Sequence, residues 1–310
     1  MNATARRPSF VCIGDLVTDV VIAVERLPIV ANQAQSVRAL FIEPGGAGNA
    51  LIMAARLGAH AIALGTMGTD EYGQAAYEAL HAEGVDLSWV QRAPGETSVI
   101  VWVIVDDAGE HTFLAREGYG APFVITDGVR AMLSAADLVL VPGYALQEQR
   151  MAAAVMPLAC QAAAAHVPIF VDPGPESSDP SLRSAVLELL GLSTFVVLTG
   201  EEAMQLSQQP SEDAAARWLL ERTRGSVVLK LGARGCSVYA RDAEPRLIPA
   251  PRVAVRDTSG AGDVFDAVFA VTWWHTRDPY QAAQRANAYA AHKVTQLGTG
   301  RRCPPGVLPE

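Results

Sequence analysis

The sequence is short of cysteine and has no long apolar run. An apolar stretch long enough to span a membrane needs ~18 residues, and none is present. The first ten residues also lack an apolar segment of the signal-peptide kind. The cysteines show no short paired spacing of a zinc site and are too few for a disulfide scaffold; they are Cys12, Cys160, Cys236 and Cys303. These absences predict a soluble cytoplasmic protein with reduced thiols.

Basic residues are in the minority. The chain has 33 acidic and 24 basic residues and a formal charge of -9 at pH 7. Such a charge repels nucleic acid and argues against a groove for a polyanion. We therefore expect small-molecule partners, and neither nucleic acid nor a membrane. Half of the 310 residues are hydrophobic, which is enough for a sizeable core.

Several catalytic signatures are missing. The Gly-Lys-Ser/Thr of a P-loop, the Gly-x-Ser-x-Gly of serine hydrolases and the His-Glu-x-x-His of zinc enzymes do not occur. A dinucleotide-binding fingerprint that starts at Gly260 would need a third glycine where Phe265 stands. This mismatch argues against an NAD-dependent oxidoreductase.

What the sequence does have is an alternation of short β-branched runs and segments of helical length. Alanine-rich helical stretches such as 48–57 and 146–165 lie between apolar runs at 9–15, 61–68, 137–143, 167–174, 194–200 and 226–232. Continuous apolar strands between helices are typical of a buried parallel sheet. We predict an α/β fold with a mostly parallel central sheet covered by helices, and ligands where the strands end.

Two segments break this alternation. Residues 19–24 and 36–43 have strand character with no helix between them, and residues 98–115 have the pattern of a hairpin that turns at Asp107–Gly109. We expect these strands to form a small β-sheet lid. Its inserts would cover about 17–44 and 96–118 of a single domain of residues 1–310.

The segment DTSGAGDVFDAVFA, residues 257–270, combines glycines and acids with an apolar run. Residues 251–255 favour a strand and residues 264–274 a helix that is buried on nearly every side, so the polar segment between them is a turn. Amides at a helix start carry partial positive charge, and small residues let an anion approach them. Gly260, Ala261 and Gly262 could therefore form an anion hole.

Asp263 stands where it would repel such an anion. An aspartate there makes sense if it takes a proton from the group that attacks the anion. An aspartate at a helix start is also a common cap or first-turn charge, and the turn alone leaves both interpretations open.

Two long motifs now point to a family. The segment DTSGAGD resembles the C-terminal signature of the ribokinase-like sugar kinases, the PfkB family, and residues 44–73 resemble its N-terminal signature. The resemblance covers essentially the whole chain. It implies a ribokinase-like fold and ATP-dependent phosphoryl transfer to a hydroxyl, with Mg²⁺ on the phosphates. It also implies that Asp263 is the base and that the amides of Gly260 to Asp263 stabilise the transferred group.

The same resemblance implies an acceptor site and a metal site. Asp19 matches an acid that binds sugar hydroxyls. Gly45, Gly46 and Asn49 match the sugar loop, although the spacing from the glycines to Asn49 is one residue shorter than in the family. The family pair Asn-x-x-Glu, which orders Mg²⁺ and phosphate through water, is matched by Glu202, with Thr199 in place of the asparagine.

Nucleotide and cation positions also follow from the resemblance. Asp257 matches an acid that helps to hold a monovalent cation in many members, but Gln296 and Arg302 depart from its usual neighbours. The resemblance therefore leaves open whether K⁺ activates this protein. The residues that match the nucleotide side are Lys230, Gly232, Asn287 and Gly298.

Three other functions remain as alternatives, namely a nucleoside kinase, a phosphosugar kinase and a non-catalytic sugar-binding relative. A binding module would not need Asp263 as a base. Residues 14–19 and 44–50 contain no Lys or Arg, so we expect a non-phosphorylated acceptor, because a buried dianion needs cations. The lid arginines are Arg26, Arg38 and Arg116. If Arg116 reached the acceptor pocket, it could bind a phosphate and overturn the expectation of a non-phosphorylated acceptor. The apolar lid strands favour a homodimer through the lid.

Overall fold

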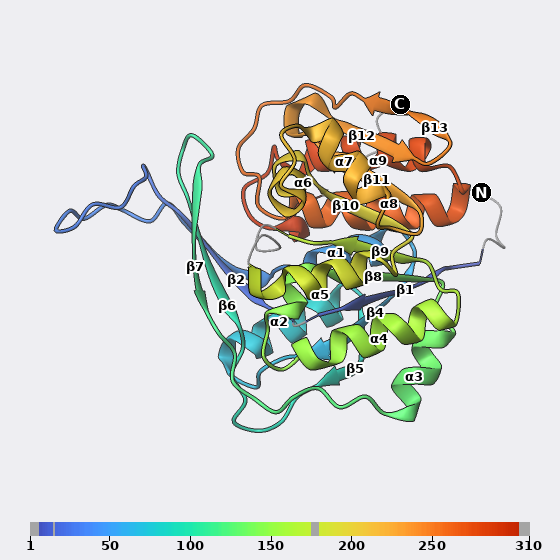
Figure 1. Ribbon diagram of the computed structural model, residues 1–310. Coiled ribbons are helices and arrows are strands. Elements are labelled where there is room, and N and C mark those ends of the chain that lie inside the picture. Colours follow the sequence, from blue (N-terminus) through green and yellow to red (C-terminus); the bar gives the residue numbers. More distant parts are fainter. Residues whose placement is uncertain (1–5, 15, 175–179, 304–310) are drawn as a thin grey trace.

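A computed structural model describes residues 6–14, 16–174 and 180–303, and everything below refers to them (Figure 1). Asp15, expected at the end of the first strand, lies outside the described residues. The described chain forms a nine-stranded sheet in the order β13-β12-β11-β10-β9-β8-β1-β4-β5. Its strands are β1 (Ser9–Ile13), β4 (His60–Thr66), β5 (Asp86–Gln91), β8 (Leu138–Pro142), β9 (Ile169–Asp172), β10 (Phe195–Thr199), β11 (Ser226–Lys230), β12 (Cys236–Ala240) and β13 (Ala243–Ile248).

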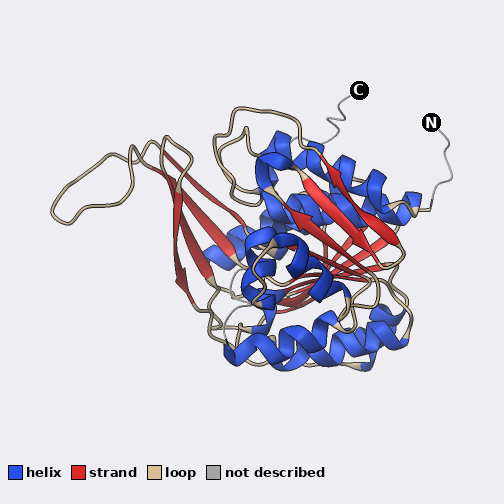
Figure 2. Ribbon diagram, turned by 45° about the horizontal axis from the view of Figure 1, so that its top comes forward, coloured by secondary structure: helices blue, strands red, loops and turns tan. Residues whose placement is uncertain are grey.

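The central sheet is parallel from β5 to β11, and β12 and β13 extend it with antiparallel pairs. Helices cover both of its faces (Figure 2). They are α1 (Ala47–Arg56), α2 (Glu71–Ala82), α3 (Asp127–Ser134), α4 (Ala152–Ala164), α5 (Pro180–Leu190), α6 (Gly200–Ser207), α7 (Glu212–Leu220), α8 (Ala261–Thr276) and α9 (Pro279–Lys293).

The core consists of two layers, one on each side of the sheet. In β1, Phe10 and Cys12 belong to the cluster under α1, α8 and α9, whereas Val11 and Ile13 belong to the cluster under α3 to α7. Side chains alternate along a strand, so a strand with helices on both sides must be apolar at every position. This confirms the predicted α/β architecture.

A second sheet of four strands, in the order β3-β2-β6-β7, stands beside the main body (Figure 1). Its strands are β2 (Thr18–Ala23), β3 (Ala39–Pro44), β6 (Ile100–Val105) and β7 (His111–Arg116). They fall within the two expected inserts, and β6 and β7 form the predicted hairpin. Val21, Ala23, Val103 and Val105 make a small core on one face of this lid. Asp19 shares that face with Val21, because strand residues two apart point the same way.

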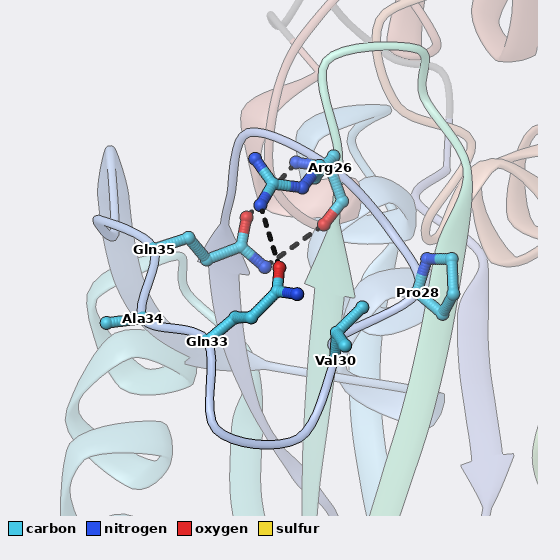
Figure 3. A pocket seen from close by; sticks show the side chains of 6 residues that line it. All are labelled: Arg26, Pro28, Val30, Gln33, Ala34 and Gln35. Carbon is cyan, nitrogen blue, oxygen red and sulfur yellow. Dashed lines mark hydrogen bonds between the residues drawn. The ribbon is translucent and has the colours of Figure 1, made fainter.

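The loop between β2 and β3 extends furthest from the main body (Figure 1). Arg26 folds this loop on itself: its guanidinium donates to Gln33, and its backbone exchanges hydrogen bonds with the Gln35 amide (Figure 3). The small pocket that Figure 3 shows within this loop is therefore formed by the loop's own side chains.

Three sequence predictions need correction. Residues 251–255 form an exposed loop and not a strand, because the sheet already ends at β13. The helix expected at 146–165 is divided into a 3₁₀ turn, Gly143–Leu146, and α4, which begins at Ala152. The strand expected at 36–43 begins only at Ala39. The sequence pattern also gave no indication of β5, β12 and β13.

No helix of the described residues has the length and apolar character needed to cross a membrane. All four cysteines are free, as expected, and only Cys160 is exposed.

Candidate active site

Helix α8 begins in the turn that the sequence singled out. Its N-cap is Gly260, whose φ of 71° is a left-handed conformation that favours glycine. A Cβ there would also lie 2.7 Å from the amide nitrogen of Gly300. The Ala261 amide donates to the Thr258 carbonyl within the turn. The amides of Gly262 and Asp263 follow in the first turn of α8, where a helix offers no internal acceptors.

Asp263 lies at this helix start and is held by Asn49 of α1. The Asn49 amide donates to Asp263 Oδ2 at 2.8 Å. Burial raises the pKa of Asp263 to about 6, with a further contribution from Asp172, while the hydrogen bond from Asn49 and the charges of Lys230 and Lys293 act to lower it. A carboxylate with a pKa just below neutral is suited to accept a proton.

Asp19 faces Gly45 in the loop before α1. A Cβ at Gly45 would lie 2.0 Å from Asp19 Oδ1, so the carboxylate occupies space that only glycine leaves free. Burial raises the pKa of Asp19 to about 8, and the neighbouring carboxylates of Asp263, Glu43 and Asp257 add to the shift. The charge of Asp263 therefore acts on the pKa of Asp19.

Tyr144 lies beside the glycine loop before α1, and the sequence analysis did not identify it. It belongs to the 3₁₀ turn after β8, and its buried hydroxyl has no hydrogen-bond partner among the described residues. A Cβ at Gly46, which has a φ of 47°, would lie 2.5 Å from this hydroxyl. Burial raises the pKa of Tyr144, and the charge of Asp263 adds to the shift. The hydroxyl therefore keeps its proton and can donate to a ligand.

Lys230, the last residue of β11, lies beside the first turn of α8. Its Nζ lies 2.7 Å from Asp172 Oδ2 and 3.5 Å from Asp266 Oδ1. A Cβ at Gly262 would lie 3.4 Å from the same Nζ. Burial acts to lower the pKa of Lys230, but the carboxylates of Asp172, Asp266 and Glu202 outweigh it and raise the pKa. The ammonium is therefore charged and next to the first turn of α8.

Asp172 and Asp266 affect each other's pKa in opposite directions. Burial raises the pKa of Asp266, and Asp172 adds to this shift. Burial would also raise the pKa of Asp172, but Lys230 reverses that and lowers it. Asp266 consequently holds the proton between them, and Asp172 carries the negative charge that pairs with Lys230.

Thr199 and Glu202 form a capping box at the start of α6. The Thr199 hydroxyl accepts from the Glu202 amide at 3.2 Å, and Glu202 Oε2 accepts from the Thr199 amide at 2.7 Å. Burial raises the pKa of Glu202, and Asp172 contributes to the shift. Thr199 thus has a structural role that an asparagine at an N-cap could also fill.

Gly232 and Asn287 differ in what surrounds them. Gly232 has a φ of 59°, and a Cβ there would meet nothing within 4 Å, so the space above it is open. Asn287 is buried in α9, and its amide donates to the Ile248 carbonyl at 2.9 Å. The structure gives Asn287 a packing partner, and its contact with a nucleotide stays a prediction.

Asp257 opens the α8 turn and is fully buried. Its carboxylate accepts from the amides of Ser259 and Gly298, each at 2.8 Å. Lys293 Nζ donates to the Asp257 carbonyl at 3.0 Å and lies 3.9 Å from Oδ1. Burial lowers the pKa of Lys293 to about 8, although Asp257 counteracts this. An ammonium thus stands where the resemblance suggested a monovalent cation.

The segment 298–303 joins the lid to α1. Glu43, buried on lid strand β3, accepts from the amide of Thr299 at 3.2 Å and from its hydroxyl at 3.0 Å. Arg302 also pairs with Glu43, at 2.5 Å. The Gly300 amide donates to Asn49 Oδ1 at 2.9 Å, so the residue that holds Asp263 is itself held.

The predicted residues therefore gather mainly around the start of α8. Asp172, at the end of an expected strand, had a signal in the sequence; Glu43, Tyr144, Asp266 and Lys293 had none. A hollow of about 340 Å³ lies elsewhere, between β13 and the start of α9, and candidate residues do not line it. Among the described residues, His, Cys, Asp and Glu form no cluster of three or more that could hold a metal ion directly.

Comparison with known proteins agrees with this arrangement. A family model described as pfkB family carbohydrate kinase matches residues 7–305. Ribokinase from Mus musculus is 29% identical over 305 residues, which cover 93% of this chain and 90% of that protein. The crystal structure of a putative ribokinase from Agrobacterium tumefaciens matches with a TM-score of 0.84 at 22% identity, over 96% of this chain and 95% of that one.

A putative ribokinase II from E. coli, solved in complex with ATP and Mg²⁺, matches with a TM-score of 0.81 at 23% identity, over 96% of each chain. These structural matches show the ribokinase-like fold. The family match over nearly the full length shows more: this chain belongs to the pfkB family of carbohydrate kinases and is a phosphotransferase.

Proposed function

We propose that this protein is an ATP-dependent kinase that transfers the γ-phosphoryl group to a hydroxyl of a non-phosphorylated sugar. The observation that carries the proposal is the position of Asp263. Its carboxylate is buried, it is oriented by Asn49, and it lies in the same helical turn as the amides that would face the phosphoryl group.

In the proposed reaction, the acceptor hydroxyl oxygen forms a bond to the γ-phosphorus while the bond from that phosphorus to the β,γ-bridging oxygen breaks. Asp263 takes the hydroxyl proton, and ADP leaves with the bridging oxygen. The amides of Gly262 and Asp263 donate to the oxygens of the transferred group, with Gly260 and Ala261 forming the turn that admits it. Phosphoryl transfer needs mainly positioning and neutralisation of charge, which a helix start and the Lys230 ammonium supply.

ATP would bind between the turns after β10 and β11. The open space above Gly232 supports this place, and Lys230 is close enough to Gly262 to reach a phosphate at the same helix start. The E. coli relative solved with ATP and Mg²⁺ supports the choice of nucleotide and metal. Asn287 and Gly298 remain proposed contacts on the nucleotide side.

Mg²⁺ would neutralise phosphate charge when bound. One oxygen of Glu202 is used by the Thr199 amide, which leaves Oε1 to bind the metal through water. Mg²⁺ usually keeps several of its waters and needs few protein carboxylates. Among the described residues, no cluster of three or more His, Cys, Asp or Glu side chains could bind a metal ion directly, and this is compatible with the proposal.

The acceptor would bind between Asp19, Tyr144 and the glycines at 45 and 46. The Tyr144 hydroxyl, buried and without a partner among the described residues, can bind an acceptor hydroxyl. Asp19 is mostly protonated below its pKa of about 8, and a protonated carboxyl can both donate to and accept from sugar hydroxyls. These groups recognise hydroxyls, whereas a phosphosugar would need cations.

The lid arginines do not supply these cations. Arg116 pairs with Asp70 at 3.0 Å and also donates to the Ser98 carbonyl. Arg38 pairs with Asp107, and Arg26 is bound within its own loop. All three engage partners of their own, which supports a neutral acceptor.

A substrate panel tests the proposal. We would measure kcat/KM for free pentoses, hexoses and nucleosides and for fructose 6-phosphate and fructose 1-phosphate, by ADP release. The proposal expects a free sugar to be the best acceptor. A nucleoside that wins by tenfold would make the protein a nucleoside kinase. A phosphosugar that wins by tenfold would refute the neutral acceptor, and Arg116→Ala should then abolish that preference.

We also propose a homodimer through the lid and a cytoplasmic location. Leu40, Ile42 and Leu114 share the lid face opposite Asp19 and are each more than 40% exposed; apolar patches of this kind commonly mark an interface. Light scattering that gives a monomer at micromolar concentration would refute the dimer. The free cysteines support a reducing compartment.

A further inference from the structure

Lys293 is the last residue of α9, and its side chain has no exposed surface. Its Nζ donates to the Asp257 carbonyl at 3.0 Å and lies 3.9 Å from the Asp257 carboxylate. A buried ammonium is costly unless it is paired and hydrogen-bonded. The position therefore demands an explanation beyond packing.

The choice of residue type is informative. The chain contains 22 arginines and only two lysines, Lys230 and Lys293. Both lysines lie beside the start of α8: Lys293 is fully buried, and the side chain of Lys230 is 12% exposed. Arginine presents a broad planar group, whereas lysine ends in a compact point charge. Lysine is thus kept at the two positions where a small cation fits among oxygens.

The oxygens around Lys293 Nζ are also of the kind that bind K⁺. Backbone carbonyls and carboxylates are the groups that bind K⁺ in proteins. Asp257 offers both, and it matches the acid that helps to hold a monovalent cation in many relatives. In this chain the ammonium already donates to that carbonyl, so a second cation would meet a like charge. The residues present therefore do not fit a bound K⁺.

The contacts of Asp257 connect this position to the chemistry. The Asp257 carboxylate accepts from Ser259 and Gly298, and the backbone amides of Arg256 and Asp257 both donate to the Val294 carbonyl. Gly260, at the end of this turn, is the N-cap of α8. A cation at the Asp257 carbonyl thus fixes the turn that presents the anion-hole amides.

We propose that Lys293 takes the place of an activating monovalent cation. Its ammonium is a tethered counter-ion that holds the turn of Asp257 to Gly260, so that the enzyme works without K⁺. Lys293 is a positioning residue, since it acts through the turn. The inference rests on the proposed kinase function, but thermal stability tests it independently of activity.

The wild-type protein gives the first test. We would compare its kcat/KM in K⁺ with that in tetramethylammonium, which is too large to enter the position, at equal ionic strength. We expect the two kcat/KM values to agree within twofold and the melting temperature to be the same in both salts. An activation by K⁺ of tenfold or more would overturn the proposal.

Lys293→Ala gives the second test, because it leaves room at the Asp257 carbonyl. We expect kcat/KM to fall at least tenfold in tetramethylammonium and to recover in K⁺ or NH₄⁺, with a melting temperature that rises with K⁺. Lys293→Met keeps the length without the charge, and we expect the same loss with no recovery. Arg285→Ala removes a half-buried charge from the same helix, and it should show no dependence on the cation.

Other results would count against the inference. Full activity of Lys293→Ala in tetramethylammonium would refute it, and so would a loss that no monovalent cation restores. If Lys293→Ala does not fold in tetramethylammonium, its refolding in K⁺ supports the inference and failure to refold contradicts it. If no acceptor is phosphorylated by the wild type, the proposed function fails, while the melting temperatures still decide the role of Lys293.

Discussion

The amide of Asn49 donates a hydrogen bond of 2.8 Å to Asp263, from a helix that precedes it by 214 residues. The other end of the same side chain accepts from the Gly300 amide at 2.9 Å. Asn49 therefore fixes the direction of the Asp263 carboxylate and is itself fixed at both ends. This pair links the acceptor loop to the proposed base, and several predictions depend on it.

Asp263→Asn should preserve the fold and lower turnover by ~10² or more, because an amide cannot take the hydroxyl proton and a positioned base contributes about that much. Steady-state kinetics would measure the loss, and the melting temperature would report the fold. Asp127→Asn is a matched control, since Asp127 is also a first-turn acid, in α3. Turnover within a few fold of wild type would exclude Asp263 as the base.

The pH dependence of kcat/KM should follow Asp263, whose pKa is raised to about 6 by burial. A base must be unprotonated, so we expect kcat/KM to rise from pH 5 to pH 7 and then to level off. Asn49→Ala removes a hydrogen bond that lowers this pKa, so the rising limb should move to higher pH. A limb that stays in place in Asn49→Ala would contradict this account of Asp263.

Asp19→Asn should stabilise the protein while it weakens acceptor binding. The pKa of Asp19 is raised from 3.8 to about 8 in the folded protein, so the unfolded chain binds fewer protons between these values and wild-type stability falls as pH rises through them. Asparagine avoids this cost. We expect a gain of about 1 kcal/mol or more at pH 8, since one pKa unit corresponds to about 1.4 kcal/mol.

Denaturant unfolding at pH 5 and pH 8 would measure that gain. It should be larger at pH 8, where wild-type Asp19 has lost more of its proton. A variant that is less stable than wild type at pH 8 would contradict the proposed cost of this buried carboxylate.

Gly46→Ala should raise the acceptor KM by about tenfold or more, since a loss of about 1.4 kcal/mol in binding is tenfold. The new methyl group would lie 2.5 Å from the Tyr144 hydroxyl and would force it to move. The KM for ATP should stay within twofold. Gly58→Ala is the control: Gly58 also has a positive φ, but a Cβ there meets nothing within 4 Å, so only stability should fall. Equal effects on both KM values would exclude a specific role at the acceptor side.

The lid should limit wasteful hydrolysis of ATP by excluding water when the acceptor is bound. Its hairpin already reaches the α8 turn, where His111 Nδ1 lies 3.4 Å from the Thr258 hydroxyl. We expect ATP turnover to rise at least tenfold on addition of the true acceptor. His111→Ala should increase the share of ATP that is hydrolysed, and His60→Ala, remote from the lid, should not. ATP turnover that is equally fast with and without the acceptor would refute gating.

The sequence was most informative where function depends on local geometry. The turn before α8, the buried helix itself and the strand ends near Asp172 and Lys230 could all be predicted, because each reflects a pattern within a few residues. The exposed loop at 251–255 was mistaken for a strand because its alternating valines have the same local pattern. Only the neighbouring strands decide whether such a segment is paired.

Contacts between distant residues could not be predicted. Lys293 meets Asp257 across 36 residues, and Tyr144 meets the Gly46 loop across about 100. A lysine at a helix end normally indicates a favourable charge on the surface, and a tyrosine after a strand gives no sign of what its hydroxyl faces. Such pairs depend on how the helices pack, which a local pattern does not contain.

The segment 298–303 has a consequence for how the enzyme is made. Its amides bind Glu43 and Asn49, which precede it by more than 250 residues. On the ribosome, the lid strand and α1 are synthesised long before these partners exist. A nascent chain can therefore build most of its central sheet while Asn49, which orients the proposed base Asp263, still lacks its hydrogen bond from Gly300. We expect the active site to be completed only after residues 298–303 have left the ribosome, so that a shorter nascent chain consumes no ATP.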